Sequence, residues 1–402
     1  MIERHRAALD AAAAAPMLAQ VRKWSAVNSG SRNLDGLATM AGLLADAFAI
    51  LPGDVVLRDP VAGAEIDGAG KANAVIFGRN LHVIVRPQAP MQLLLTGHMD
   101  TVYAVDHPFQ ALTDLDGGAV INGPGVADMK GGIALMLAAL AALEASTLAE
   151  RIGYEVIINS DEEIGSPGSA ALIAERASGK LAALTYEPSA LPDGTLAGAR
   201  PGSGNFSIVI SGRSAHAGRN PEDGRNAIVA AGDLALRLSR ARRAGLSINP
   251  ARIDGGGPNN MVPDQAVLRV NLRPALPGDQ MEAERLLDDL IRAVAADHDV
   301  GIQRHGGFGR PPKPIDDKAA RLFALVEDSA AVLGRPIIHK ASGGVCDGNN
   351  IAACGVPVVD TMGACGGAIH SANEYLIVDS LAERAQLSTL VMLRLAEDGL
   401  RA

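Results

Sequence analysis

The chain has 402 residues, a length that favours two domains over one compact core. Hydrophobic residues make up 48% and charged residues 20%, a globular rather than a disordered composition. The net charge of −9 argues against nucleic-acid binding. No uninterrupted apolar run reaches membrane-spanning length, so a membrane partner is not expected either.

The first ten residues carry charges and lack an apolar stretch before a cleavage site, so we predict no signal peptide and expect a cytoplasmic location. Three cysteines, Cys346, Cys354 and Cys365, favour reduced, buried thiols over a disulfide framework or a structural zinc site. Residues 198–313 hold 16 Lys and Arg against 12 Asp and Glu, whereas the rest of the chain is acidic. A basic segment suits an anionic substrate, although a solvated surface produces the same imbalance.

Residues 2–50 carry apolar side chains at helical spacing and are predicted to be helical. Short strands are expected at residues 55–57, 74–77 and 82–85. The stretch LLLTGHMDTV, residues 93–102, begins as an apolar strand and ends in polar residues. His98 and Asp100 point to the same face of such a strand, which suits a metal ligand and its supporting carboxylate. A histidine that is merely hydrogen-bonded at a strand end is the plainer alternative.

A glycine-rich loop at residues 123–132 leads into a strongly helical, apolar stretch at residues 133–143. Asp128 lies in this loop. The helix dipole alone would explain an acidic residue near a helix start. Asp128 is therefore a candidate ligand only in the company of others.

Two further apolar strands end in acidic residues. The strand at 154–159 runs into Asp161, Glu162 and Glu163, and the strand at 181–186 runs into Glu187. Consecutive carboxylates repel one another unless cations lie near them, and a solvated charge cluster is the usual case. Acids at strand ends, however, suit a site at the carboxyl edge of an α/β sheet.

From about residue 198 the pattern changes to alternating strands and amphipathic helices, which indicates a small domain with a one-faced antiparallel sheet. The α/β pattern resumes after a link rich in glycine and proline at residues 306–312. We therefore predict an α/β fold class: a catalytic α/β domain with a central, mostly parallel sheet flanked by helices, and an inserted smaller α+β domain. The predicted bounds are 1–197 with 310–402 for the first and 198–309 for the second.

The candidate ligands share one chemistry. Two histidines and several carboxylates, without thiolates, suit Zn²⁺ or a similar divalent ion. This number of acids accommodates two ions that share a bridging carboxylate. The set comprises His98, Asp128, Glu162, Glu163, Glu187 and His370.

Six motifs in order over nearly the whole chain resemble the di-zinc metallopeptidases that include glutamate carboxypeptidase, aminoacylase and succinyl-diaminopimelate desuccinylase. Glutamate carboxypeptidase is the most similar in appearance; residues 106–109 and the loop 342–348 contribute to that impression. The motifs are GHMDTV (97–102), GPGVADMKGG (123–132), SDEEIGS (160–166), EP (187–188), SAHAG (214–218) and HS (370–371).

The resemblance implies two Zn²⁺ per chain, with Co²⁺ or Mn²⁺ as possible substitutes, and a cis peptide bond after Asp128. It implies that Glu162 is the general base and that Asp100 orients His98. The implied ligands are Asp128 as the bridge, His98 and Glu187 at one ion, and Glu163 and His370 at the other.

The resemblance also implies a homodimer built on the inserted domain, in which His216 reaches the partner's active site and stabilises the oxyanion. A surface-loop histidine is the alternative. Arg273 and Asn260 would bind the terminal carboxylate of the substrate, since a guanidinium grips a carboxylate with two hydrogen bonds. For Arg273 the alternative is an exposed arginine at a strand end.

The implied function is a zinc-dependent exo-hydrolase that removes a C-terminal amino acid, expected to be Glu or Asp, from a small peptide or N-acyl amino acid. A glutamate at position 187 favours such substrates over desuccinylase chemistry. Hydrolysis of acidic oligomers such as oligo-aspartate, and aminoacylase or dipeptidase activity, remain alternatives. A non-catalytic binding protein would require the loss of ligands or base, and all are present.

Overall fold

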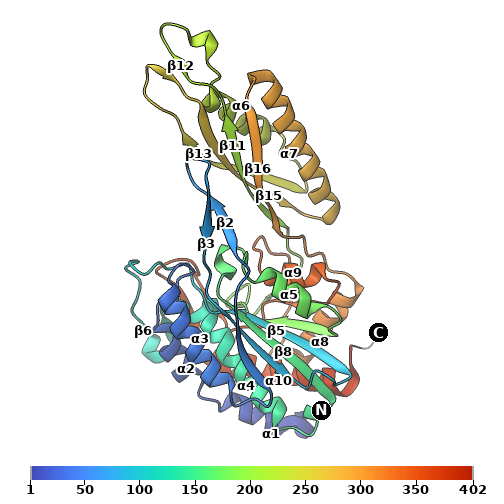
Figure 1. Cartoon of the computed structure of the whole chain (residues 1–402). Coiled ribbons are helices and arrows are strands. Elements are labelled where there is room, and N and C mark those ends of the chain that lie inside the picture. The colour runs from blue at the N-terminus through green and yellow to red at the C-terminus, as the bar shows by residue number, and fades with distance from the viewer. Residues whose placement is uncertain (1, 401–402) are drawn as a thin grey trace.

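The computed structural model describes residues 2–400 and has two lobes (Figure 1). The larger lobe is built on a six-stranded sheet of order β1-β4-β8-β5-β9-β18. Strands β8, β5, β9 and β18 are parallel, and β4 runs antiparallel to both of its neighbours, β1 and β8. Its strands are β1 (Asp54–Arg58), β4 (Asn80–Val85), β8 (Ile152–Asn159), β5 (Met91–His98), β9 (Ala182–Thr185) and β18 (Val358–Val359).

Helices cover both faces of this sheet. Leu93 and Leu95 of β5 face the larger core, whereas Leu94 faces a smaller core shared with α5 and α9, as the two-residue period of a strand requires. The helices are α1 (Ile2–Ala13), α2 (Met17–Ser25), α3 (Leu34–Phe48), α4 (Gly132–Glu144), α5 (Ala170–Ala177), α8 (Asp317–Val332), α9 (Asp347–Ala353) and α10 (Asp379–Asp398). The segment Val126–Glu144 is apolar and long enough to cross a membrane, but 94% of it is buried, as in a core helix.

The second lobe is the segment predicted to be inserted. Its four strands form an antiparallel sheet of order β13-β15-β11-β16, which packs against two helices around a hydrophobic core of its own. The elements are β11 (Ser203–Ser211), α6 (Ala227–Arg240), β13 (Leu246–Gly255), β15 (Gln265–Pro274), α7 (Pro277–His298) and β16 (Gly301–Arg310). The predicted fold class is therefore confirmed. The division at residues 198 and 309 stays a prediction, which the separate core supports.

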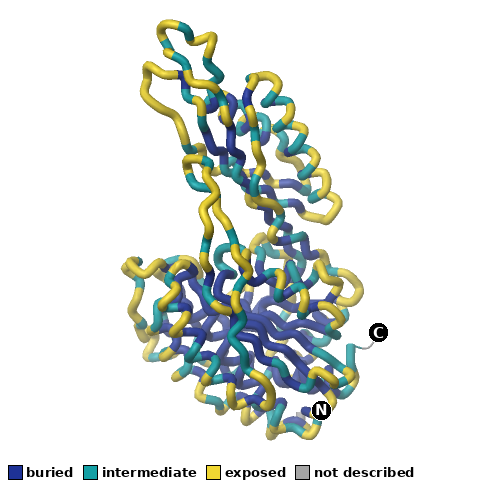
Figure 2. Tube along the Cα trace, viewed as in Figure 1, coloured by how far each residue is buried: buried dark blue, intermediate teal, exposed yellow. Residues whose placement is uncertain are grey.

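Two chain crossings join the lobes. The backbones of Arg200 and Lys313 exchange hydrogen bonds of 3.0 Å, and both side chains form ion pairs with the buried Asp360, at 2.8 Å and 3.1 Å. A hairpin of β2 (Gly63–Ile66) and β3 (Ala72–Val75) also spans the gap, and Arg269 of β15 donates a hydrogen bond to the Ile66 carbonyl. Figure 2 shows that this hairpin is largely exposed, in contrast to the buried six-stranded sheet.

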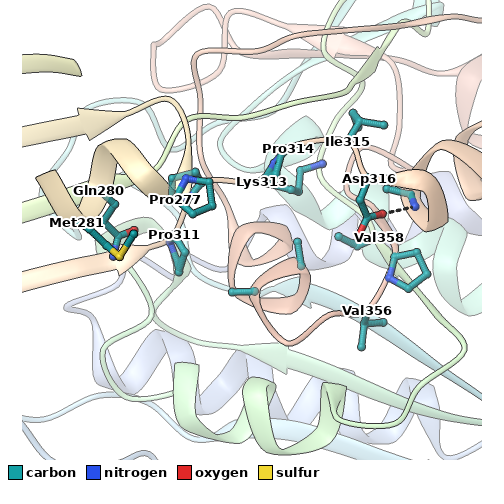
Figure 3. A pocket seen from close by; sticks show the side chains of 15 residues that line it. Pro277, Gln280, Met281, Pro311, Lys313, Pro314, Ile315, Asp316, Val356 and Val358 are labelled. Carbon is teal, nitrogen blue, oxygen red and sulfur yellow. Dashed lines mark hydrogen bonds between the residues drawn. The ribbon is translucent and has the colours of Figure 1, made fainter. Parts of the chain in front are cut away.

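A cavity of about 410 Å³ lies beside this junction (Figure 3). Prolines and apolar side chains line most of it, including Pro277 at the start of α7 and Pro311. Its two charged residues are engaged elsewhere: Asp316 caps α8 by accepting from the Ala319 amide, and Lys313 pairs with Asp360. The cavity therefore has none of the chemistry that the strand-end acids offer.

The three cysteines are free thiols. Cys346 and Cys365 are buried, as expected, but Cys354 is exposed. The expectation was wrong for Cys354 because this residue follows the short helix α9 and lies at its solvent end.

Candidate metal centre

The parallel strands bring the predicted acids to one edge of the sheet. β5 ends at His98, the neighbouring β8 runs into the turn that holds Glu162 and Glu163, and β9 on the other side runs into Glu187. Because parallel neighbours present their carboxyl ends at the same edge, residues far apart in the sequence meet there.

Asp128 lies between two groups of potential ligands. Its Oδ1 is 3.1 Å from Nε2 of His98, which is 3.6 Å from Oε2 of Glu187. Its Oδ2 is 3.3 Å from Nε2 of His370, which is 3.2 Å from Oε2 of Glu163. In each trio the three ligand atoms lie within 4.8 Å of one another. Asp128 thus contributes one carboxylate oxygen to each trio, which is the arrangement of a bridging ligand.

The hydrogen bonds of His98 set its tautomer. Nδ1 lies 3.0 Å from the backbone carbonyl of Asp100, and because a carbonyl only accepts, Nδ1 carries the hydrogen. Nε2 faces the carboxylates of Asp128 and Glu187. Burial opposes the charged ring, but these carboxylates raise the pKa of His98 well above its ordinary value, so a divalent cation would take the place of the Nε2 proton. Three electron-pair donors aimed at one point, with oxygen and nitrogen chemistry, fit a divalent cation such as Zn²⁺.

Asp100 supports the site in a way that the sequence predicted only in part. Its Oδ1 is 3.4 Å from Nδ1 of His98, close to the expected contact. The same carboxylate accepts the backbone amides of Glu162 and Glu163, at 3.1 and 3.2 Å, and the Ser31 hydroxyl at 2.6 Å. Asp100 therefore fixes the acidic turn as well as the imidazole.

A second buried carboxylate, Glu374, supports the Asp128 loop and was missed by the sequence analysis. It accepts the backbone amides of Gly125, Ala127 and Asp128 at 3.0–3.1 Å, and the Tyr103 hydroxyl at 2.8 Å. Its position four residues after His370 was the only signal. The Asp128–Met129 peptide bond is cis, as the resemblance implied.

Burial makes this set of charges costly. It raises the pKa of Glu187 to about 8, against the opposing effect of His98. It also raises the pKa of Glu163 to about 7, with a further contribution from Asp128. Hydrogen bonds to Asp128 and Glu163 raise the pKa of His370 to about 10. Without a cation the site therefore holds protons. A divalent cation would replace them, because metal ligands bind in their deprotonated forms.

The two trios differ in access. The His98 side chain is 1% exposed, whereas that of His370 is 53% exposed. His370 also lines a cleft of about 800 Å³ between the lobes, together with Glu162, Glu163 and Arg273. A substrate would therefore approach from the His370 side.

Glu162 belongs to neither trio. Its carboxylate lies 2.7 Å from Nη2 of Arg310. Burial raises the pKa of Glu162 to about 8, although Arg310 opposes the shift. The Glu162 side chain also lines a smaller cavity of about 240 Å³, together with Asp128, Glu187 and His370. A carboxylate beside the ligands, but outside both trios, is free to move a proton.

The predicted substrate ligands are separated. Arg273 donates to the Gly343 carbonyl and to Oδ1 of Asn271 at the wall of the large cleft. His216 lies in β12 (Ala215–His216), which pairs with β14 (Met261–Val262) at the far end of the second lobe (Figure 1). Asn260 is exposed beside it and accepts the Ala217 amide. Within one chain Asn260 thus accompanies His216 and not Arg273, and the predicted role of both Asn260 and Arg273 in substrate binding stays a prediction.

The bridging position of Asp128 predicts the outcome of metal analysis. Wild-type protein should hold two divalent ions per chain, and Asp128→Ala should lose both, because each trio loses a ligand. Zinc at 100 times its Kd should stabilise the wild type by about 2.7 kcal/mol and so raise its unfolding temperature. The unfolding temperature of the variant should not change. Removal of an exposed carboxylate, in Glu65→Ala, is the control. Two ions retained by Asp128→Ala would contradict the assignment.

Comparison with known proteins agrees with this geometry. Residues 94–394 match the model of peptidase family M20/M25/M40. Carboxypeptidase G2 of Pseudomonas sp. (strain RS-16) is 30% identical over 384 residues, which cover 92% of this chain and 86% of that protein.

Two solved structures share the fold. A tripeptidase from Staphylococcus aureus has a TM-score of 0.73 at 24% identity, covering 95% of this chain and 98% of that one. Bacillus subtilis YXEP, described as a dinuclear metal-binding peptidase, has a TM-score of 0.66 at 16% identity, covering 94% and 97%. With the extent of the family match, these findings show that the chain belongs to peptidase family M20/M25/M40, a family of metal-dependent hydrolases.

Proposed function

We propose that the chain is a two-metal exo-hydrolase that cleaves the amide bond before a C-terminal amino acid, with Glu or Asp preferred. The observation that carries the proposal is the pair of ligand trios that share Asp128, with the carboxylate of Glu162 beside them. Family membership supports metallopeptidase or amidohydrolase chemistry. Zinc is the proposed metal because the donors are imidazole and carboxylate, with Co²⁺ or Mn²⁺ as substitutes.

In this proposal His98, Glu187 and Asp128 hold one ion, and Glu163, His370 and Asp128 hold the other. Bound divalent ions supply a polarised substrate carbonyl and a water that ionises near neutral pH. The Glu162 carboxylate accepts a proton from the attacking water and donates it to the nitrogen of the leaving amine.

An arginine at the cleft supports recognition of a free C-terminus. Arg273 at the wall of the large cleft is placed to receive the α-carboxylate, since a guanidinium binds a carboxylate bidentately. Arg200 also lines the smaller cavity, but Asp360 and the Gly344 carbonyl already engage all three of its guanidinium nitrogens, so the proposed preference for an acidic side chain rests on the motif resemblance. The name of the relative carboxypeptidase G2 agrees with cleavage at a C-terminus.

We propose further that the enzyme is a homodimer in which the tip of the second lobe completes the partner's site. His216 and Asn260 are polar, exposed and adjacent, and they lie far from the metal ligands of their own chain. A partner's tip would bring both to the cleft, where His216 would stabilise the oxyanion and Asn260 would bind the substrate.

Replacement of Glu162 by Gln should keep the fold and two metal ions but lower kcat by about 100- to 10,000-fold, because the proton transfer is lost. Steady-state kinetics and metal analysis on the same preparation are the measurement. A variant within tenfold of wild type would place the base elsewhere.

The proposed role of Arg273 predicts that a C-terminally amidated dipeptide is a poor substrate for wild type. Arg273→Lys should raise KM for the free acid and lower kcat too, because a misplaced substrate reacts slowly. The assay should screen N-acyl amino acids and dipeptides with varied C-terminal residues, and include oligo-aspartate. Equal cleavage of amidated and free-acid substrates would refute the carboxypeptidase assignment.

The trans role of His216 predicts complementation between inactive variants. After subunit exchange, a mixture of His216→Ala and Glu162→Gln should regain activity, since some hybrid dimers contain one intact composite site. Mass spectrometry of differently tagged subunits would verify exchange. An exchanged mixture without recovered activity would show that His216 does not act across the interface.

A further inference from the structure

Arg310 has no role in the function proposed above, although it is one of the most buried charged residues near the site. It is the last residue of β16, where the second lobe returns to the α/β lobe, and it is 3% exposed. Its Nη2 donates to Oε1 of Glu162 at 2.7 Å and to the Ser166 hydroxyl at 2.9 Å. Its Nη1 donates to Oδ1 of Asp347 at 2.5 Å.

Asp347 anchors this guanidinium. It begins α9, lies within the glycine-rich segment 342–348 that contributes to the motif resemblance, and is 2% exposed. Its Oδ1 also accepts the Ser166 hydroxyl at 2.7 Å, and its Oδ2 accepts the Asn159 side-chain amide at 2.8 Å. With these donors in place, Asp347 cannot turn away from Arg310 without leaving buried polar groups unpaired.

Burying a carboxylate–guanidinium–carboxylate chain costs desolvation free energy. Desolvation of three charges offsets much of their attraction, and well-packed apolar side chains of the same volume are often at least as stabilising. Stability alone therefore does not account for the chain Asp347–Arg310–Glu162. Its terminal member is the proposed base, whose backbone amide is already fixed by Asp100.

We propose that Arg310 is a positioning residue that, held by Asp347, fixes the carboxylate of Glu162 for proton transfer; this rests on the proposed role of Glu162. The planar guanidinium suits the task because it presents parallel donors to two carboxylates at once, which a lysine ammonium cannot do. Because Arg310 ends β16, the position of the base is also tied to the junction between the lobes.

A double-mutant cycle tests the proposal. Arg310→Gln should lower kcat by about 100-fold, the order expected for misplacement by about 1 Å, with two metal ions retained and KM nearly unchanged. In the Glu162→Gln background, where no base remains to be positioned, the same substitution should lower the residual kcat by less than threefold. An equal loss in both backgrounds, or an effect on KM alone, would overturn the proposal.

Milder variants keep the test decisive if Arg310→Gln does not fold. Arg310→Lys should retain more activity than Arg310→Gln, and Asp347→Asn should lower kcat but again have little effect in the Glu162→Gln background. In metal-free protein, the changes in unfolding temperature for Arg310→Lys and Glu162→Gln should be non-additive. Additive changes there, together with wild-type kcat in Arg310→Lys and Asp347→Asn, would refute the positioning role.

Arg86→Gln is the matched control. Arg86 forms a bidentate ion pair with Glu144. It follows β4, at the end of the sheet opposite the metal ligands. Its loss should lower the unfolding temperature without changing kcat. Since Glu162→Gln alone tests the base, a failure of the base assignment is distinguishable from a failure of the Arg310 assignment.

Discussion

The mutual repulsion of carboxylates gathered at one edge of a buried sheet is the constraint on which the rest of the site depends. Asp128, Glu162, Glu163 and Glu187 line one cavity of about 240 Å³. Two unit charges 4 Å apart repel by about 4 kcal/mol at an effective dielectric constant of 20. Bound protons, the imidazoles of His98 and His370, and the guanidiniums of Arg200 and Arg310 offset part of this repulsion within the chain. Divalent cations would offset the rest.

The structure meets this constraint by dividing adjacent acids between different partners. Glu163 faces His370 and Asp128, whereas Glu162 faces Arg310. Supporting carboxylates, in turn, bind backbone: Asp100 accepts the amides of the acidic turn in addition to facing His98, and Glu374 accepts the amides of the Asp128 loop. Fixing the backbone in this way leaves the ligand side chains free to face one another.

Sequence patterns predicted the fold class, and they picked out the candidate ligands that the structure gathers at one sheet edge, because both follow local rules. An apolar strand followed by acids predicts a residue at a sheet edge, and the helix-and-strand order predicted the second lobe. The supporting residues that come from distant segments of the chain were not predicted. Glu374, Arg310 and Asp347 meet their partners only through tertiary packing, and no local period marks them. The position of Asn260 escaped prediction for the same reason, since the pairing of β12 with β14 carries Asn260 to the far tip.

The central claim is that Asp128 bridges two cations, and anomalous diffraction from crystals grown with zinc tests it most directly. The account predicts two peaks at the zinc absorption edge, one among His98, Asp128 and Glu187 and the other among Asp128, Glu163 and His370. A single peak, or two peaks of which either lies out of reach of Asp128, would contradict it.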